Sequence, residues 1–461
     1  MDDILTINKI KDFKKTFNKS RTNKIIANTV QKNGIWDSAF DSEEARELNP
    51  VFSNEIKDFP SVTNQKRSGR CWMFAALNVL RGIIAKNLGV KDIELSESYL
   101  MFYDKLEKSN VQLETVLNTL NEKDDSRLME RILNLGGHTD GGYWGYFVNL
   151  VKKYGVVPQV VMPEVFSSSD SAQMNTVIDQ LITKDTIILR NGYKEGKDVE
   201  ELRELKGRML EEIYKVLAIC LGQPVDKFTF EYIKDAPKEK KEGDLKLFED
   251  EEKEPSFARI STTPLDFFNN YCGKNLDDYI SLANWPMPNM KEYQLYSFKY
   301  INNVIGSDKM LFINVPVEDL KTAAIQTIKD NEPLWFACDV STFSNRQDGY
   351  LSTEILDIDN LLGVSLYYDK GQRLLYRSSQ CNHAMTLTGV NLDKNGKPNK
   401  WKVQNSWGTD IGHKGIYVMS DKWFDEFVYE VVVNKKYLNE KMQKAMKGKV
   451  IDLDIWSPAS K

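Results

Sequence analysis

The sequence predicts an α+β fold in which a helical first half and a β-rich last third form two lobes with a cleft between them. Apolar residues recur at helical spacing from residue 72 onward, whereas short alternating segments separated by Gly, Asn and Asp follow residue 330. The chain of 461 residues is too long to fold around one small hydrophobic core. We therefore expect two or three domains, or one core with large insertions.

The composition is that of a globular protein without a basic excess. Hydrophobic residues make up 41% and aromatic residues 11%, and 62 Lys and Arg against 67 Asp and Glu give a net charge of −5. The chain has no surplus of positive charge to neutralise a phosphate backbone, so nucleic acid is a poor candidate partner. The five cysteines are scattered and odd in number, and neither a signal peptide nor a bilayer-spanning run is found. A cytoplasmic protein without membrane contact is expected.

The N-terminal third begins with an arm and leads to a cysteine at the start of a helix. Residues 1–50 form the arm, with a short helix near residues 7–17. The polar loop 64–70 then runs into a helix that stops at Gly89, and Cys71 stands at its N-terminus. Unpaired N–H groups and the helix dipole favour a thiolate there, and such positions lower a thiol pKa from about 8.5 to roughly 3.5–7.5. On this stretch alone, Cys71 is either a nucleophile or a small buried hydrophobe.

The middle of the chain is predicted to be mainly helical. Ser96 is a candidate N-cap for a helix that runs to residue 106, and the amphipathic pattern 111–135 predicts a second, solvent-facing helix. The glycine cluster 136–145 is either a close backbone approach or an ordinary surface loop. The later segments are a helix over 146–154, a proline-punctuated connection over 155–164, helices over 172–181 and 197–217, a mixed-charge solvated loop over 237–255 and a helix that opens at Thr263-Pro264.

The last third of the chain is predicted to be rich in β-strands. A helix is predicted over residues 317–329. The segments with strand-like patterns are 334–340, 383–390, 401–404, 415–419 and 428–433. The cysteine-bearing helix would therefore face a β-rich lobe.

A thiolate nucleophile needs a base, and the chain offers His138, His383 and His413. His383 is the best candidate, because it opens an alternating strand and the small Ala384 beside it would let a substrate backbone approach. His138 and His413 stand beside glycines and are interpreted as loop residues.

Two further side chains complete a possible catalytic group. Asn405, 22 residues after His383, would accept the second ring N–H of the histidine, and Trp407 would shield that hydrogen bond from water. Gln65 would donate to an oxyanion together with the N–H of Cys71.

The stretches around Cys71, His383 and Asn405 resemble those of papain-type cysteine peptidases. Cys71 and His383 are 312 residues apart, against about 130–150 in the ordinary papain type. More than a hundred residues must therefore be inserted between them.

The insertions point to the bleomycin hydrolase and aminopeptidase C family, which the chain resembles over nearly its whole length. The segments that carry the resemblance are 64–81, 140–142, 156–164, 333–340, 383–390 and 401–438. The resemblance implies a papain-like two-lobe fold, with a helical left lobe, a β-barrel-like right lobe and large helical insertions. The implied parts are an arm (1–50), a left lobe (51–164), a helical insertion with a charged loop (165–305), a right lobe (306–450) and a C-terminal arm in the active-site cleft (451–461).

The resemblance also implies the roles of individual residues. Cys71 is the nucleophile, His383 the base and acid, Asn405 the orienting residue and Gln65 an oxyanion donor. The implied substrate-binding residues are Asp140, Gly141, Gly142, Trp407, Ala384 and Lys461, whose terminal carboxylate would pair with a substrate α-ammonium. The implied activity is removal of N-terminal residues from short peptides and related amides by a homohexamer, without metal or organic cofactor.

Two other functions stay open from the residues alone. A Cys-His-Asn acyltransferase would use the same side chains, and a peptide-binding shell would need no nucleophile. Cys381-Asn382-His383 is half of a possible metal site, but a second ligand pair with suitable spacing is lacking. The residues interpreted as core are Cys220, Cys272, Cys338, Tyr143 and Trp144.

Overall fold

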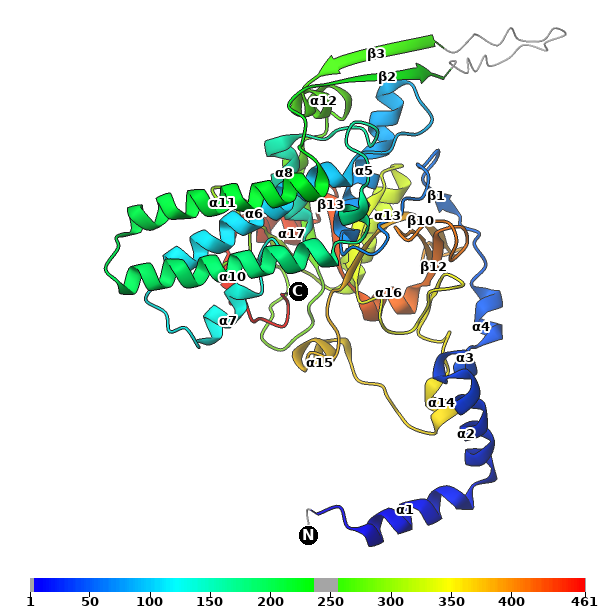
Figure 1. The fold of residues 1–461 in the computed structure, drawn as a ribbon. Coiled ribbons are helices and arrows are strands. Elements are labelled where there is room, and N and C mark those ends of the chain that lie inside the picture. Colours follow the sequence, from blue (N-terminus) through cyan, green and yellow to red (C-terminus); the bar gives the residue numbers. More distant parts are fainter. Residues whose placement is uncertain (1–3, 236–255, 461) are drawn as a thin grey trace, which may run out of the picture.

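The computed structural model describes residues 4–235 and 256–460, and Figure 1 shows its helices and strands. A mixed sheet forms the centre of the fold. Its described strands follow the order β14-β5-β6-β4-β13-β7-β10-β11-β12-β9-β8, and β1 also pairs with β10. The predicted combination of a helical part and a β-rich part is confirmed.

The N-terminal arm projects from this body (Figure 1). It consists of α1 (Ile7–Lys19), α2 (Arg21–Asn33), α3 (Ile35–Ala39) and α4 (Ser42–Glu47). One helix near residues 7–17 is predicted here, and it lies inside α1. The other three helices were not predicted: α3 and α4 are only five and six residues long, too short for an apolar period to show, and α2 was missed.

The cysteine-bearing helix agrees with its prediction. α5 spans Cys71–Leu88, and Gly89 ends it in the left-handed conformation with φ 76°. The first three turns of the helix are buried all round, because every residue over 71–81 is buried.

The predicted break near residue 106 and the solvent-facing helix over 111–135 are wrong. A single helix, α6 (Glu97–Asn118), runs through both segments with Ser96 as its N-cap, and the short α7 (Arg127–Leu133) follows. α6 is largely buried because α10 and α11 pack against it, so its polar residues find partners inside the protein rather than in water.

The middle of the chain extends the helical part. The elements are α8 (Trp144–Tyr154), α9 (Phe166–Ser169), α10 (Ala172–Lys194), α11 (Val199–Leu221), β2 (Phe228–Lys234), β3 (Ser256–Thr262) and α12 (Pro264–Tyr271). Thr263 caps α12 as its sequence predicts. β2 and β3 form a separate hairpin, and the predicted charged loop over 237–255 lies outside the described residues.

The sheet uses more of the chain than its sequence predicts. Its strands are β1 (Asn54–Glu55), β4 (Tyr279–Ala283), β5 (Gln294–Phe298), β6 (Phe312–Asn314), β7 (Leu334–Cys338), β8 (Ser344–Asn345), β9 (Tyr350–Leu351), β10 (His383–Leu392), β11 (Pro398–Gln404), β12 (Ile416–Ser420), β13 (Val428–Asn434) and β14 (Ile451–Leu453). β4 and β5 fall in the segment 165–305 that is predicted as a helical insertion. They pair with strands of the right lobe instead, so the proposed boundary at residue 305 cuts through the sheet.

Helices cover both faces of the sheet. α13 (Val317–Lys329) matches its predicted bounds, and α16 (Asp421–Phe427) and α17 (Glu440–Met446) also contact the strands. α14 (Ile358–Leu362) packs against α3 instead, and Lys370 at the start of α15 (Lys370–Leu375) donates to the carbonyl of Val428 in β13. Alternate residues of β7 enter two different cores: Trp335 and Ala337 pack with α5, whereas Phe336 packs with α13 and α16. The sheet thus separates one core from the other.

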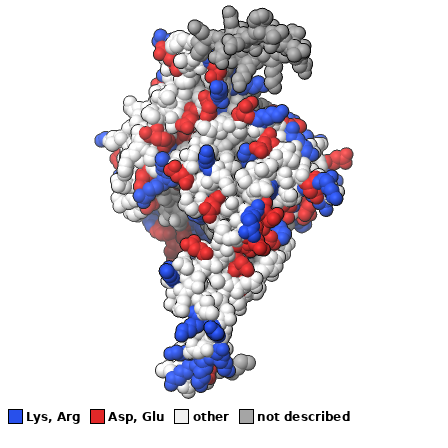
Figure 2. Space-filling model, turned by 90° about the vertical axis from the view of Figure 1, so that its right-hand side faces the viewer, with Lys and Arg blue, Asp and Glu red and all other residues white. Residues whose placement is uncertain are grey.

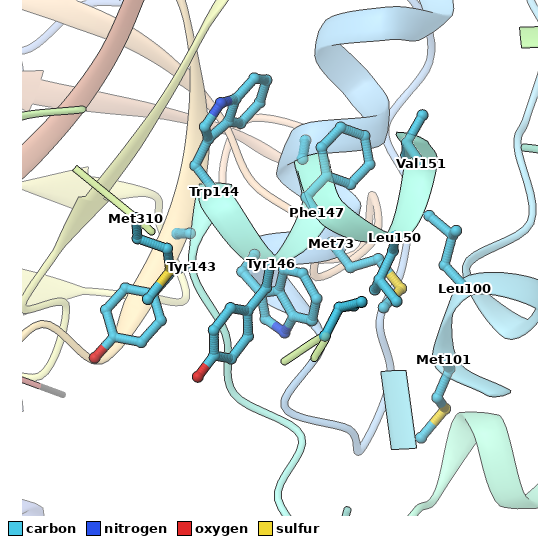
Figure 3. Close-up of a cluster of buried hydrophobic side chains, with 14 of the residues drawn as sticks. Met73, Leu100, Met101, Tyr143, Trp144, Tyr146, Phe147, Leu150, Val151 and Met310 are labelled. Carbon is cyan, nitrogen blue, oxygen red and sulfur yellow. The ribbon is translucent and has the colours of Figure 1, made fainter. Parts of the chain in front are cut away.

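The larger core lies where α5, α6 and α8 meet. Figure 3 shows its side chains, among them Met73 of α5, Leu100 and Met101 of α6, and Trp144, Phe147, Leu150 and Val151 of α8. Burial of this many large side chains fixes α8 against the first turns of α5.

The described part of the C-terminal arm is ordered against the body. β14 pairs in parallel with β5, and Ile455 and Ala459 are buried in the larger core. The carbonyl of Trp456 accepts a hydrogen bond from the Arg377 guanidinium. Separately, among residues 4–235 and 256–460 no helix combines the length and apolar character needed to cross a bilayer.

One glycine shows how tightly α8 is joined to α12. Gly155 ends α8 at φ 73°, and a Cβ there would lie 2.2 Å from the backbone carbonyl of Pro264. We predict that Gly155→Ala lowers the free energy of unfolding by about 2–5 kcal/mol, the sum of left-handed strain and a backbone clash. Gly196→Ala is the matched control, because Gly196 has φ 94° but nothing within 4 Å of its Cβ position. Denaturant unfolding of both variants measures the difference, and equal losses would contradict the clash.

Candidate active site

A cleft of about 400 Å³ brings together segments that are far apart in the sequence. Cys71 and Trp72 from the start of α5 line one part of it, and His383 and Ala384 from the start of β10 line another. Gly141 and Gly142 form a third part. The cleft therefore unites the predicted nucleophile, the predicted base and the glycine turn.

Cys71 occupies the position expected for an activated thiol. It is the first residue of an 18-residue helix, and it is preceded by Arg70, whose side chain does not cap the helix. The positive end of the helix dipole favours a thiolate at this point. Arg70 is instead buried and donates to both carboxylate oxygens of Glu164, at 2.9 and 2.7 Å, which anchors the loop before the cysteine.

His383 is held by a carboxamide and covered by an indole. Its Nε2 lies 2.8 Å from Oδ1 of Asn405, which is fully buried. The ring of Trp407 lies against the imidazole, with 4.6 Å between the centroids. Because Nε2 donates to Asn405, the other ring nitrogen, Nδ1, is the one that can exchange a proton with a thiol.

Gln65 is positioned by residues of both lobes. Its Nε2 donates to the carbonyl of Ser68 at 2.6 Å, and its Oε1 accepts from the hydroxyl of Ser406 at 2.7 Å. Its backbone N–H donates to the carbonyl of Ser406 at 2.8 Å. The amide orientation is therefore set, and Nε2 keeps a second hydrogen for an acceptor in the cleft.

The Asp140 side chain is part of the framework of the cleft rather than of its lining. Its carboxylate accepts from the Lys105 ammonium at 2.8 Å and from the Gly69 N–H at 2.9 Å. Burial alone would raise the pKa of Asp140, but Lys105 and the hydrogen bonds from Gly69 and Ser171 outweigh it and hold that pKa well below its usual range. The backbone of Gly141 and Gly142, by contrast, faces the cleft as expected.

Two other substrate-binding expectations need revision or stay open. Trp407 is not among the described residues that line the cleft, since its indole is used against His383. None of the described residues 451–460 lines the cleft either, because the arm is paired with β5 and packed into the core. Lys461 lies outside the described residues, and whether it reaches the cleft stays a prediction.

Several residues around the site were missed from sequence. Lys105 and Lys108 carry no motif, and their role appears only when α6 is folded against the glycine turn. Ser406 follows Asn405 directly, and its position beside a candidate orienting residue was the one available signal. Tyr143 and Tyr146 belong to the core, as expected for Tyr143, but both also line the cleft, and Figure 3 shows their hydroxyl groups on the same side of α8.

Of the remaining histidines and cysteines, only Cys338 and Cys381 lie near His383 in the described part of the chain: Cys338 is its partner across β7 and β10, and Cys381 stands two residues before it. His138 approaches Asp179 at 3.6 Å, and the His413 ring contacts Tyr350, both in loops as expected. Cys338 is fully buried, and burial raises the pKa of the Cys272 thiol. Cys381 lines the cleft. In the described part of the chain, no group of three or more His, Cys, Asp or Glu side chains is placed to hold a metal ion.

Comparisons with known proteins agree with this geometry. The family model described as the Peptidase C1-like family matches residues 4–460. The chain is 40% identical to Aminopeptidase E of Lactobacillus helveticus and 38% identical to Aminopeptidase C of Listeria monocytogenes, each over 98% of both chains. The crystal structure of PepW from Lactobacillus rhamnosis HN001 is similar with a TM-score of 0.91 at 38% identity, covering 100% of this chain and 99% of that one.

The two-lobe fold and the Cys, His and Asn side chains around one cleft define a papain-like thiol peptidase. The chain belongs to the Peptidase C1-like family. The resemblance to bleomycin hydrolase and aminopeptidase C is thereby confirmed.

Proposed function

We propose that this protein is a cysteine aminopeptidase that removes N-terminal residues from short peptides and hydrolyses related amides. The main support for the proposal is that Cys71 and His383 line the same cleft. In addition, Nε2 of His383 lies 2.8 Å from Oδ1 of Asn405. Relatives that are 38–40% identical to this chain over nearly their full length are named aminopeptidases.

In the proposed mechanism, the Cys71 thiolate attacks the carbonyl carbon of the first peptide bond and forms a tetrahedral oxyanion. The Cys71 N–H and Gln65 Nε2 donate hydrogen bonds to that oxygen. The imidazolium of His383 gives its Nδ1 proton to the leaving amine, the C–N bond breaks, and a thioester remains. His383 then takes a proton from water, the hydroxide attacks the thioester, and the free amino acid leaves with the thiolate restored.

Restriction to N-terminal residues requires a partner for the substrate ammonium. Among the described residues that line the cleft, none is Asp or Glu, and Lys108 is the one Lys or Arg. An ammonium group entering this lining would lack a carboxylate counter-charge. We propose that the terminal carboxylate of Lys461 supplies it, as the resemblance implies, although the Lys461 side chain brings an opposing charge.

We further propose a homohexamer, with the N-terminal arm contacting a neighbouring copy. None of the described residues of α1 and α2 is buried, and the large apolar side chains of α1 lie in water: Ile7 is 72%, Phe13 62% and Phe17 50% exposed. Figure 2 shows this arm as a narrow projection whose tip is rich in Lys and Arg. Exposed apolar faces of this kind are typical of protein interfaces.

A cytoplasmic location is proposed on chemical grounds. The nucleophile must stay reduced, and an odd number of scattered cysteines suits a reducing compartment. Short peptides with a free N-terminus are the proposed substrates there.

The activity itself is the first test. We predict that the purified chain hydrolyses a panel of amino-acid anilides with a free α-amine, and that Cys71→Ala reduces the rate to background because no thioester forms. Asn405→Ala is expected to lower kcat/KM by about tenfold to a hundredfold, since the imidazole loses its orienting partner. Chromogenic assays measure both, and circular dichroism checks the fold.

The same assay separates the alternatives. Transfer of the acyl group to an added amine in preference to water would indicate an acyltransferase. Unchanged peptide binding by Cys71→Ala without turnover by the wild type would indicate a binding shell.

The role of the C-terminal arm gives the next prediction. Deletion of residues 458–461 is expected to shift cleavage towards internal bonds, whereas removal of Lys461 alone is expected to keep or raise aminopeptidase activity because the new terminus still carries a carboxylate. Mass spectrometry of the products from one unblocked and one N-acetylated peptide measures the shift. An unchanged product pattern after the longer deletion would remove the arm from the mechanism.

The arm at the other end gives a prediction about assembly. A chain lacking residues 1–33 is expected to lose the hexamer but still to fold, because none of the described residues it loses is buried within its own chain. Light scattering after size exclusion measures the mass. Phe13→Asp with Phe17→Asp in the full chain should act in the same way, and a hexamer that survives both changes would contradict the proposed contact.

A further inference from the structure

Two buried lysines lie beneath the glycine turn of the cleft, and the proposed chemistry uses neither. Lys105 and Lys108 stand three residues apart on α6, with side chains only 1% and 5% exposed. Burial of two ammonium groups this close together is costly unless each one is paired and fully hydrogen-bonded. Their partners show what the two charges hold in place.

Lys105 holds Asp140, and Asp140 holds the loop before the nucleophile. The Lys105 ammonium donates to the Asp140 carboxylate at 2.8 Å and to the Gly137 carbonyl at 3.1 Å. The other carboxylate oxygen of Asp140 accepts from the backbone N–H of Gly69, two residues before Cys71, at 2.9 Å. A Cβ at Gly69 would lie 2.8 Å from the Asp140 Cβ, so the two segments are as close as their atoms allow.

The inserted helix α10 supplies the remaining partners of this carboxylate. Asn175 donates to Asp140 at 2.9 Å and accepts from Lys105 at 2.6 Å, so its amide bridges the ion pair. Ser171, just before α10, donates to Asp140 at 2.5 Å. Asp140 thus receives four hydrogen bonds from three separate parts of the chain.

Lys108 holds the next residue of the turn. It donates to the Gly141 carbonyl at 2.7 Å, and its charge is paired with Asp104 at 2.6 Å. The indole of Trp72, the residue after the nucleophile, donates to the Asp140 carbonyl at 2.7 Å. A Cβ at Gly142 would meet the same indole at 2.5 Å. The glycine turn is therefore pressed against the first turn of α5.

We propose that Asp140 is a positioning residue, whose carboxylate fixes the glycine edge of the cleft relative to the Cys71 thiolate. The inference rests on the proposed peptidase function and adds that α10 helps to set the active-site geometry. A substrate held by the Gly141–Gly142 backbone then meets the sulfur at a constant separation. A displacement of about 1 Å at such a site can cost a factor of roughly 10² in rate.

The test uses a double variant of the full chain, Lys105→Met with Asp140→Asn. Changing both residues leaves no unpaired buried charge, which a single change would create. Two rates are compared with the wild type: kcat/KM for a free-amine dipeptide anilide, and the second-order rate of Cys71 alkylation by iodoacetamide. Iodoacetamide needs the thiolate and His383 but not the glycine edge. The expected result is at least a tenfold loss of kcat/KM with an alkylation rate within twofold of the wild type.

A matched control separates positioning from general weakening of α6. Lys206 and Glu114 pair at 2.5 Å between α11 and α6, and neither lines the cleft. Lys206→Met with Glu114→Gln is expected to leave both rates unchanged. Asn175→Ala provides a milder variant, expected to lower kcat/KM in the same direction with the same alkylation rate.

Three results would overturn the inference. These are an unchanged kcat/KM in the Asp140 double variant, a parallel fall of kcat/KM and alkylation, and an equal loss of kcat/KM in the Lys206 control. Absence of turnover by the wild type would instead count against the proposed function, so the two failures are distinguishable.

Discussion

The site depends on the packing of one buried helix against two strands. α5 lies on the face of the sheet formed by β7 and β10, and two hydrogen bonds fix it there: Trp335 Nε1 donates to the Trp72 carbonyl at 3.0 Å, and Thr386 Oγ1 donates to the Ala75 carbonyl at 3.2 Å. The first residue of the helix and the first residue of β10 thereby line the same cleft. A thiol at a helix N-terminus and an imidazole at a strand end each have ordinary surroundings, and they acquire joint chemistry only through this contact.

Elements with strong local signals could be predicted from the sequence. The start and end of α5, the N-caps at Ser96 and Thr263, and the bounds of α13 all rest on residues within a few positions of the feature. A capping side chain or a left-handed glycine acts over one turn, so a single sequence contains the information. Cys71, His383 and Asn405 were proposed in another way, from residue type and spacing aided by a family resemblance.

Features that depend on distant neighbours were not predictable in this way. α6 contains polar residues all round, which favours a solvent-facing helix until α10 and α11 are known to cover it. β4 is short and lies in a mainly helical stretch, and its place in the sheet follows from pairing with β13, about 150 residues later. Asp140 was predicted to bind substrate, but its side chain accepts hydrogen bonds from Lys105 and Gly69, which no pattern in its own segment indicates.

The inserted helices cannot be separated from the catalytic lobe. One continuous core contains Leu80 of α5, Leu113 of α6, Ile178 of α10 and Ile213 of α11, all less than 1% exposed, together with Ala337 and Ala384 of the sheet. A decoration on a finished domain would bury its own apolar residues and meet the domain through a polar interface. Here the inserted helices and the helical lobe share one interior, so the added length between Cys71 and His383 belongs to the structure that holds the cleft in shape.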